Sequence, residues 1–249
     1  RSVWFSFTGS YALSAPYNDE TRRYYQLMTR FSSNLAMLSD IAMLTLGGDL
    51  KRKERISARL GDILSYLYLA SATLKRYNDE GRQSADLPLV QWAVEDSLYN
   101  IQQAISELIN NFPNRAVAVA LKLTILPLGC WLKKPSDATD HKVAALLQYH
   151  NETRSRLGQG QYLTREPGNI LGQLEQTLED IIACEPIFDK ICRELGQRLP
   201  FYDLDLVAKK GLAANIISEE EAALLTATEV ARKATINVDD FDSDYLKAG

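Results

Sequence analysis

Apolar residues recur three or four positions apart along most of this chain. In residues 54–82 they form one seam, which consists of Ile56, Leu60, Ile63, Leu67, Ala70, Leu74 and Tyr77. Alternating gaps of four and three place such residues on one face of an α-helix that packs on neighbouring helices. Strand-like alternation is almost absent, so the pattern predicts an all-α fold.

Three further long helices are predicted on the same grounds. Residues 19–47 form one, with Asp19 as the expected cap and glycines at its end, and residues 86–112 form another. The fourth covers residues 114–134 and is expected to kink at Pro127, because proline lacks an N–H group and its ring clashes with the preceding turn. Four helices of this length suit an antiparallel bundle.

The helical pattern becomes shorter after this bundle. Shorter helices are predicted at residues 139–149, 170–184, 186–195, 203–214 and 218–233, with a polar loop at 151–169. Ser218 and Glu221 match a capping box, in which each side chain satisfies a main-chain amide of the other residue. We therefore expect two regions: a four-long-helix bundle in residues 1–134 and a smaller helical appendage with an acidic tail in residues 135–249.

Composition and charge narrow the class of protein. Hydrophobic residues make up 46% of the chain and charged residues 24%, as in ordered globular proteins, and the net charge of −4 argues against a nucleic-acid partner. The three cysteines lack CxxC spacing, which favours a reducing cytoplasm over a disulfide framework. No signal peptide is recognisable, and because the chain begins with Arg1 we expect it to be part of a longer protein.

Motifs for catalysis and metal binding are not found in the sequence. GxGxxG, GxxxxGKS/T, HExxH and GxSxG are all absent, and the two histidines have no further ligands nearby in the chain. Asp240, Asp242 and Asp244 alternate as in an EF-hand loop, but Tyr245 stands where that loop requires glycine. We therefore predict no catalytic, cofactor-binding or metal-binding residue in this chain.

A polar loop offers a candidate phosphate contact. Arg154 and Arg156 could present guanidinium groups, and Gly158 and Gly160 could expose main-chain amides, to a phosphate such as that of CoA. The same composition also suits a loop that only reverses the chain. The basic run at residues 51–53 is similarly open to two interpretations, a solvated helix start or a contact with an anionic partner.

The apolar stretch at residues 116–132 is the second candidate contact. Its only charge, Lys122, and Pro127 lie near its middle and count against a membrane crossing. A helix that is apolar all round usually lies in a protein core. The alternative is contact with a membrane surface or a partner through Lys122, Leu126, Trp131, Lys133 and Lys134.

Long blocks of the chain resemble one protein family. These blocks are FSSNLAMLSDIAMLTLGGDLKRKERISARLGDILSYLYLASATLKRYNDEGR, DLPLVQWAVEDSLY, NFPNRAVA, PSDATDHKVAALLQ and TRSRLGQGQYLT. They are similar to the C-terminal region of large bacterial FAD-dependent acyl-CoA dehydrogenases, the enzymes that open fatty-acid β-oxidation. The similarity runs from Arg1 to the acidic tail.

The resemblance implies a parent enzyme in which several domains hold FAD and acyl-CoA. In such enzymes a glutamate removes the α-proton while hydride passes to the flavin, and in long bacterial members it lies in a Val-Glu-Gly-Ala-Asn-like motif. That motif is absent here, and Glu80-Gly81, which shares two of its letters, follows a long amphipathic helix that a glycine would end. We expect FAD in the parent enzyme, and neither flavin nor activity in this chain alone.

The resemblance leaves three hypotheses about function. In the first, this C-terminal helical region serves domain or subunit packing, membrane docking or substrate access. Its partners would be the catalytic domains of the same enzyme. The whole enzyme would be a homodimer, either cytoplasmic or peripheral on the inner membrane. The second hypothesis is an independent all-helical adaptor module. The third is binding of acyl-CoA or lipid by this region alone, through Arg154 and Arg156.

Overall fold

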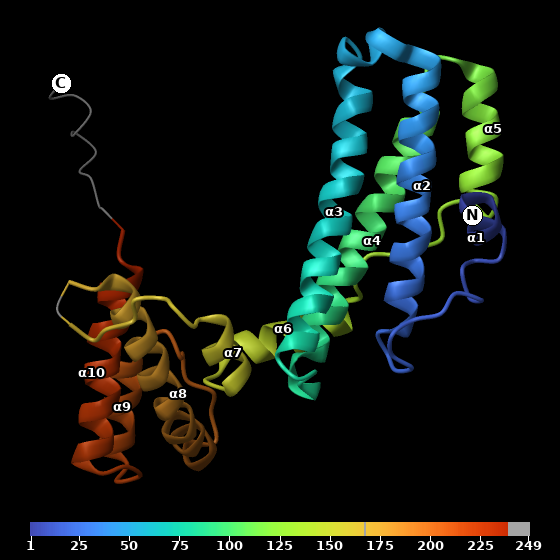
Figure 1. The fold of residues 1–249 in the computed structure, drawn as a ribbon. Coiled ribbons are helices and arrows are strands. Elements are labelled where there is room, and N and C mark those ends of the chain that lie inside the picture. The colour runs from blue at the N-terminus through green and yellow to red at the C-terminus, as the bar shows by residue number, and fades with distance from the viewer. Residues whose placement is uncertain (167, 239–249) are drawn as a thin grey trace, which may run out of the picture. The chain divides into compact units, whose positions relative to one another are not determined.

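A computed structural model describes residues 1–166 and 168–238 of the chain (Figure 1). Every regular element in these residues is a helix, so the predicted all-α fold is confirmed. The chain divides into two compact units, Arg1–Gln148 and Tyr149–Gly249. Most of the predicted acidic tail, including the three aspartates compared above with a calcium loop, lies outside the described residues.

The first unit is an antiparallel bundle built on three long helices (Figure 1). These are α2 (Arg22–Leu46), α3 (Glu54–Asp79) and α4 (Leu87–Asn110), joined by short 3₁₀ turns at Gly47–Lys51 and Ser84–Asp86. Three shorter helices complete the unit: α1 (Ser2–Phe7), α5 (Arg115–Ile125) and α6 (Asp137–Gln148). Helix α1 contacts both α2 and α5, whereas α5 and α6 both pack on α4.

The apolar seams read from the sequence form the core of this bundle. Side chains that are at most 2% exposed include Phe31, Leu38, Ile63, Leu74, Leu98, Ile101 and Leu108. Burying a side chain of this size contributes about 1.5–3 kcal/mol to folding. The three- and four-residue spacing thus fixes which face of each long helix turns inward.

The fourth helix of the bundle is shorter than predicted. Helix α5 ends at Ile125, just before Pro127, so the predicted kinked helix that continues to Lys134 is wrong. Proline disfavours helical backbone in the residue before it, and Leu126 leaves the helical region with φ −119° and ψ 50°. The unit itself extends beyond the predicted boundary at residue 134, because Trp92 of α4 donates a 2.6 Å hydrogen bond to Asp140 of α6.

The start of the first long helix also differs from the prediction. Helix α2 begins at Arg22, with Thr21 in the N-cap position, so Asp19 does not cap it. A carboxylate oxygen of Asp19 instead accepts hydrogen bonds from the amide and the hydroxyl of Thr21, at 2.9 and 2.7 Å. Asp19 also pairs with Arg82, which follows α3. The aspartate therefore fastens the start of α2 to the end of α3.

The described residues of the second unit form four helices, α7 (Glu152–Leu157), α8 (Ile170–Leu195), α9 (Leu204–Ala213) and α10 (Glu219–Ile236). Helices α8, α9 and α10 contact one another around a core of fully buried side chains, among them Cys184, Ile191, Leu204, Val207 and Leu225. The capping box of Ser218 and Glu221 is confirmed at the start of α10.

Two predictions for the second unit are wrong. Helix α8 continues through Pro186, where the sequence had suggested two helices separated by a break. Proline there removes one helical hydrogen bond, which the rest of this 26-residue helix tolerates. The predicted loop at 151–169 also contains helix α7, which Asn151 caps by accepting a 2.9 Å hydrogen bond from the amide of Arg154.

Candidate functional site

The candidate phosphate contact lies in the second unit, in a hollow of about 380 Å³. Its lining includes His150, Arg154, Gly158 and Glu175, so the structure brings Arg154 and Gly158 to one place. Arg156 and Gly160 lie outside this lining. We call this place the Arg154 hollow.

The charge of Arg154 is already balanced by a carboxylate. Its two terminal nitrogens donate to the two carboxylate oxygens of Glu175, at 2.8 and 2.5 Å, in a bidentate pair. A phosphate that enters the hollow would have to compete with Glu175 for the same donors. Arg156 lies 3.9 Å from Glu152 within the same short helix. The phosphate contact at Arg154, Arg156, Gly158 and Gly160 therefore stays a prediction, and the pairing does not favour it.

The apolar stretch at 116–132 is neither wholly buried nor wholly exposed. Ala118, Leu121 and Ile125 face the core, and so does Leu126, which is only 7% exposed. The opposite face of α5 exposes Val119 and Leu123 to 59% and 62%, as well as Lys122. The helical part of the stretch, up to Ile125, is thus amphipathic, with an outer face that is also largely apolar.

The residues after α5 lie on the surface of the first unit. Trp131, Lys133 and Lys134 are all exposed, and the Lys134 ammonium lies 5.5 Å from the ring centre of Tyr99. The main-chain amide of Trp131 donates a 3.1 Å hydrogen bond to the buried Gln102 side chain of α4. A membrane contact at these residues stays a prediction.

Helix α1 is built the opposite way from the long helices. It buries Ser2 and Ser6, which are 8% and 0% exposed, and turns Val3, Trp4 and Phe7 outward with exposures of 41%, 65% and 59%. Helix α1 contacts α5 (Figure 1), and the outward side of α5 carries Val119 and Leu123. We call the surface formed by Val3, Trp4, Phe7, Val119 and Leu123 the α1–α5 apolar face.

A polar stripe on α2 holds α1 in this orientation. Arg23, Gln26, Arg30 and Asn34 recur every three or four residues, and the last three are at most 3% exposed. The amide oxygen of Asn34 accepts hydrogen bonds from the hydroxyls of Ser2 and Ser6, at 2.5 and 3.4 Å. The inward serines of α1 are therefore explained by the polar residue that they meet.

The remaining members of the stripe bind main-chain carbonyl groups. Gln26 donates to the carbonyl oxygens of Tyr11 and Leu13, at 3.2 and 2.8 Å, and Arg23 donates to that of Gly9 at 2.6 Å. Arg30 donates to the carbonyl oxygen of Ile125 at the end of α5, at 3.1 Å. Burial lowers the pKa values of both arginines. The stripe thus fastens the N-terminal segment and α5 to α2.

Sequence reasoning missed this stripe. Polar residues at helical spacing opposite an apolar seam look like a solvated face, and nothing in their order shows that a second segment covers them. One signal was available in the sequence. Ser2 and Ser6 are four residues apart and so share one helix face, whereas the large apolar Trp4 and Phe7 fall on another face of the same helix. That inverted pattern indicates a helix whose polar side packs inward.

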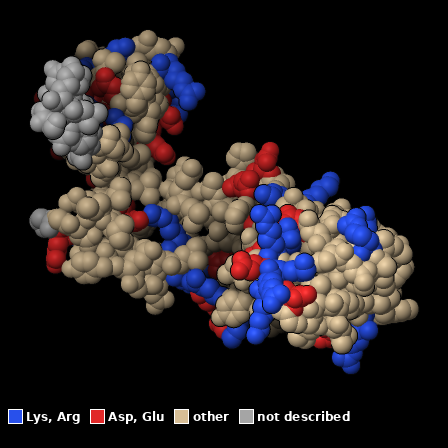
Figure 2. Space-filling model, turned by 90° about the horizontal axis from the view of Figure 1, so that it is seen from above, with Lys and Arg blue, Asp and Glu red and all other residues tan. Residues whose placement is uncertain are grey.

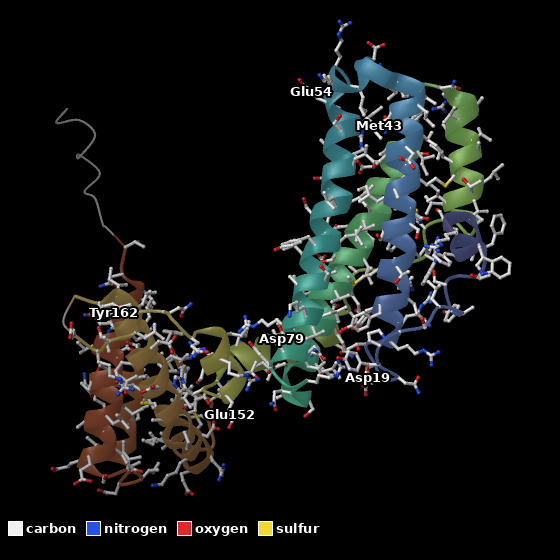
Figure 3. All side chains as sticks on the ribbon, viewed as in Figure 1. Asp19, Met43, Glu54, Asp79, Glu152 and Tyr162 are labelled. Carbon is white, nitrogen blue, oxygen red and sulfur yellow. The ribbon has the colours of Figure 1, made fainter. Side chains whose placement is uncertain are left out.

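The Glu80-Gly81 pair ends helix α3, as predicted. Glu80 occupies the C-cap position and Gly81 has the left-handed φ of +80° that favours glycine. The Glu80 carboxylate pairs with Arg76 at 2.7 Å. Figure 3 labels Glu54 at the start of α3 and Asp79 at its last residue, with Asp19 near that end.

Within residues 1–166 and 168–238, no group of three or more histidine, cysteine, aspartate or glutamate side chains is placed to hold a metal ion. None of the helices in these residues combines the length and the apolarity that crossing a membrane requires.

Comparison with known proteins identifies the family of this chain. The family described as acyl-CoA dehydrogenase, C-terminal, bacterial type, matches residues 1–241. No solved structure matched the chain. Because the family match spans nearly the whole sequence, the chain belongs to the bacterial-type acyl-CoA dehydrogenase C-terminal family.

Proposed function

We propose that this chain is the helical domain through which an acyl-CoA dehydrogenase packs on its own catalytic domains. The observation that carries the proposal is the inverted helix α1, which exposes Trp4 to 65% and Phe7 to 59% while it buries two serines. The parent enzyme would oxidise fatty acyl-CoA to trans-2-enoyl-CoA with FAD. This chain would contribute contact surface and no reacting group.

The α1–α5 apolar face suits contact with another protein domain. Large apolar side chains gathered on one face are typical of surfaces that another molecule covers. Full burial of a large apolar side chain contributes about 1.5–3 kcal/mol; Trp4 and Phe7 are 65% and 59% exposed, so covering both would supply about 2–4 kcal/mol. A six-residue helix is marginal by itself in water. The polar stripe of α2 holds it to the bundle before any partner arrives.

The family implies FAD in the whole enzyme, and the Arg154 hollow is the place in this chain where a phosphate of such a cofactor could be sought. A flavin dinucleotide brings a pyrophosphate, which requires cationic or amide donors that no carboxylate occupies. Both terminal nitrogens of Arg154 are bonded to Glu175, and that carboxylate also lines the hollow. The hollow does not fit the group, and we propose no flavin contact there.

Homodimerisation of the parent stays a prediction from the resemblance.

The proposal is tested by binding between the two parts of the enzyme. The full 249-residue chain and the catalytic region of the same dehydrogenase are produced separately and mixed in sedimentation-velocity experiments. A stable complex is expected with the unchanged chain, and at least tenfold weaker association with the double variant Trp4→Glu and Leu123→Glu. The matched control Leu44→Glu and Tyr68→Glu alters side chains that are 85% and 71% exposed elsewhere on the bundle.

Each outcome of this experiment bears on the proposal. Circular dichroism should show equal helix content in all three forms, because every altered side chain is exposed. Absence of a complex with the unchanged chain would overturn the proposal. An equal loss with the control variant would also do so, since association would then depend on general surface charge and not on the α1–α5 apolar face.

A further inference from the structure

We propose that the bundle binds a phosphate group at the end where α3 begins. A hollow of about 440 Å³ lies there, and its lining includes four cationic side chains, Arg52, Lys53, Arg55 and Arg59, and one carboxylate, Glu54. Figure 2 looks down on this end of the bundle and shows Lys and Arg side chains gathered on it. We call this place the cationic hollow.

Two of these cations have no carboxylate partner. In the described ranges of the chain, neither Lys53 nor Arg55 forms an ion pair, and both are exposed. Arg52 lies 3.8 Å from Asp49, with both side chains largely in solvent. Arg59 pairs with Glu107 of α4 at 3.2 Å and is only 17% exposed, so its position is held from two helices. The hollow therefore keeps an excess of positive charge.

The position of this charge opposes the stability of α3. The N-terminus of a helix carries a partial positive charge, which anions stabilise and cations destabilise. Lys53 occupies the N-cap position of this 26-residue helix without a capping hydrogen bond from its side chain. Acidic or small polar residues would serve folding better there. A phosphate in the hollow would reduce the repulsion among the cations. It would also accept hydrogen bonds from the uncapped main-chain amides at the start of α3.

The opposite end of the same helix shows the contrasting arrangement. There Lys75 pairs with Asp79 at 2.6 Å and Arg76 with Glu80 at 2.7 Å, and Arg82 pairs with Asp19. Each cation at that end has a carboxylate, although cations already suit a helix C-terminus. Uncompensated positive charge on α3 is thus confined to the end where it is least favourable for folding, which is the pattern expected of a binding site.

The remaining lining of the cationic hollow suits a phosphate ester. Ile56, which is buried, and Pro113 both line it, so apolar side chains form part of the wall. Asn111, also in the lining, directs its amide nitrogen to the carbonyl oxygen of Glu107 at 2.8 Å. The phosphate could belong to a soluble ester or to a lipid headgroup, because both present the same oxygens to arginine and lysine.

Two binding measurements distinguish these sources. Inorganic pyrophosphate is titrated into the full chain by calorimetry, and sedimentation is measured with vesicles of phosphatidylcholine alone or with phosphatidylglycerol added. The test variant is Lys53→Gln with Arg55→Gln. The control is Lys75→Gln with Lys142→Gln, which removes the same charge from two exposed positions outside the hollow.

The expected result is binding that falls at least tenfold in the test variant and changes less than twofold in the control. If the test variant loses pyrophosphate binding, the site is assigned to a soluble phosphate ester. If the test variant loses only vesicle binding, the site is assigned to a lipid headgroup. The midpoint of thermal unfolding without ligand should stay equal or rise in the test variant, because two unfavourable cations leave the start of α3. No binding of either probe, or an equal loss in the control, would overturn the proposal.

Discussion

Replacing Glu229 by glutamine should destabilise the second unit by about 2–3 kcal/mol. Glu229 of α10 is fully buried, and its carboxylate accepts hydrogen bonds from Arg232 at 2.8 and 3.0 Å and from the main-chain amide of Leu204 at 3.5 Å. The Lys233 ammonium lies 3.1 Å away. The amide of glutamine keeps one acceptor oxygen but turns an NH₂ group toward these donors.

The magnitude follows from the kind of pair that is broken. Removing one partner of a buried ion pair costs about 3–5 kcal/mol, and a single charge-assisted hydrogen bond about 1.5–3 kcal/mol. The full penalty is reduced here because water can solvate the released cations: the side chains of Arg232 and Lys233 are 18% and 53% exposed. We therefore expect a loss of about 2–3 kcal/mol, just below the range for a fully buried pair.

Cys184 provides the assay. Its thiol is fully buried in the core of the second unit, 3.3 Å from the Thr228 hydroxyl, so a thiol reagent reaches it only when that core opens. When opening is a rapid equilibrium, a loss of 2–3 kcal/mol accelerates labelling about 30- to 150-fold. Exposed Cys130 gives the intrinsic labelling rate, and peptide mass spectrometry separates the two sites.

Two controls decide whether the reasoning holds. Glu220→Gln makes the same change of charge at an exposed position of α10 and should alter Cys184 labelling less than threefold. All three tryptophans, Trp4, Trp92 and Trp131, lie in the first unit, so their fluorescence unfolding curve should not move. Labelling within threefold of the unchanged protein, or a shift of the tryptophan curve, would refute the argument.

Two further predictions concern pH and the polar stripe. The bonds from Arg232 hold the pKa of Glu229 at about 2, below its ordinary value near 4.5, so the stability it contributes is present above pH 4.5 and is lost as the pH falls toward 2. The difference in unfolding free energy between Glu229→Gln and the unchanged chain should therefore shrink over that range; a constant difference would contradict the assigned cause. Asn34→Ala removes the acceptor of both α1 serines and should speed hydrogen exchange in α1 at least tenfold, whereas Thr45→Ala, at the exposed end of α2, should not.

The long helices could be predicted because their periodicity encodes a buried face. The seam from Ile56 to Tyr77 is a property of neighbouring positions, and the capping box joins Ser218 and Glu221, which are only three positions apart. Both signals are local, so no knowledge of distant contacts is needed. The helix break predicted at Pro186 was wrong. Proline is a local signal against a helix, and here the rest of the long helix α8 outweighs it.

The candidate sites depend on contacts between distant residues and could not be read from the sequence. Arg154 looks like a free phosphate ligand until Glu175, in the next helix, occupies its guanidinium. Asn34 and Ser2 look like solvated polar residues until the chain brings them together across 32 positions. Nothing in the spacing of either pair predicts the pairing, because each depends on how two helices are packed.

A residue that stabilises its own helix or turn can be explained by structure alone, whereas a residue that destabilises it points to a function. Gly81 follows a glutamate, as in the catalytic motif of the family, yet its left-handed backbone and the Arg76–Glu80 pair both serve to end a helix. Both features serve to end the helix, so a structural role accounts for them. Trp4, which faces solvent, and Lys53, which sits at the positive end of α3, both oppose local stability. Conflicts of this kind persist where function requires them, and these two positions are therefore where partners should be sought.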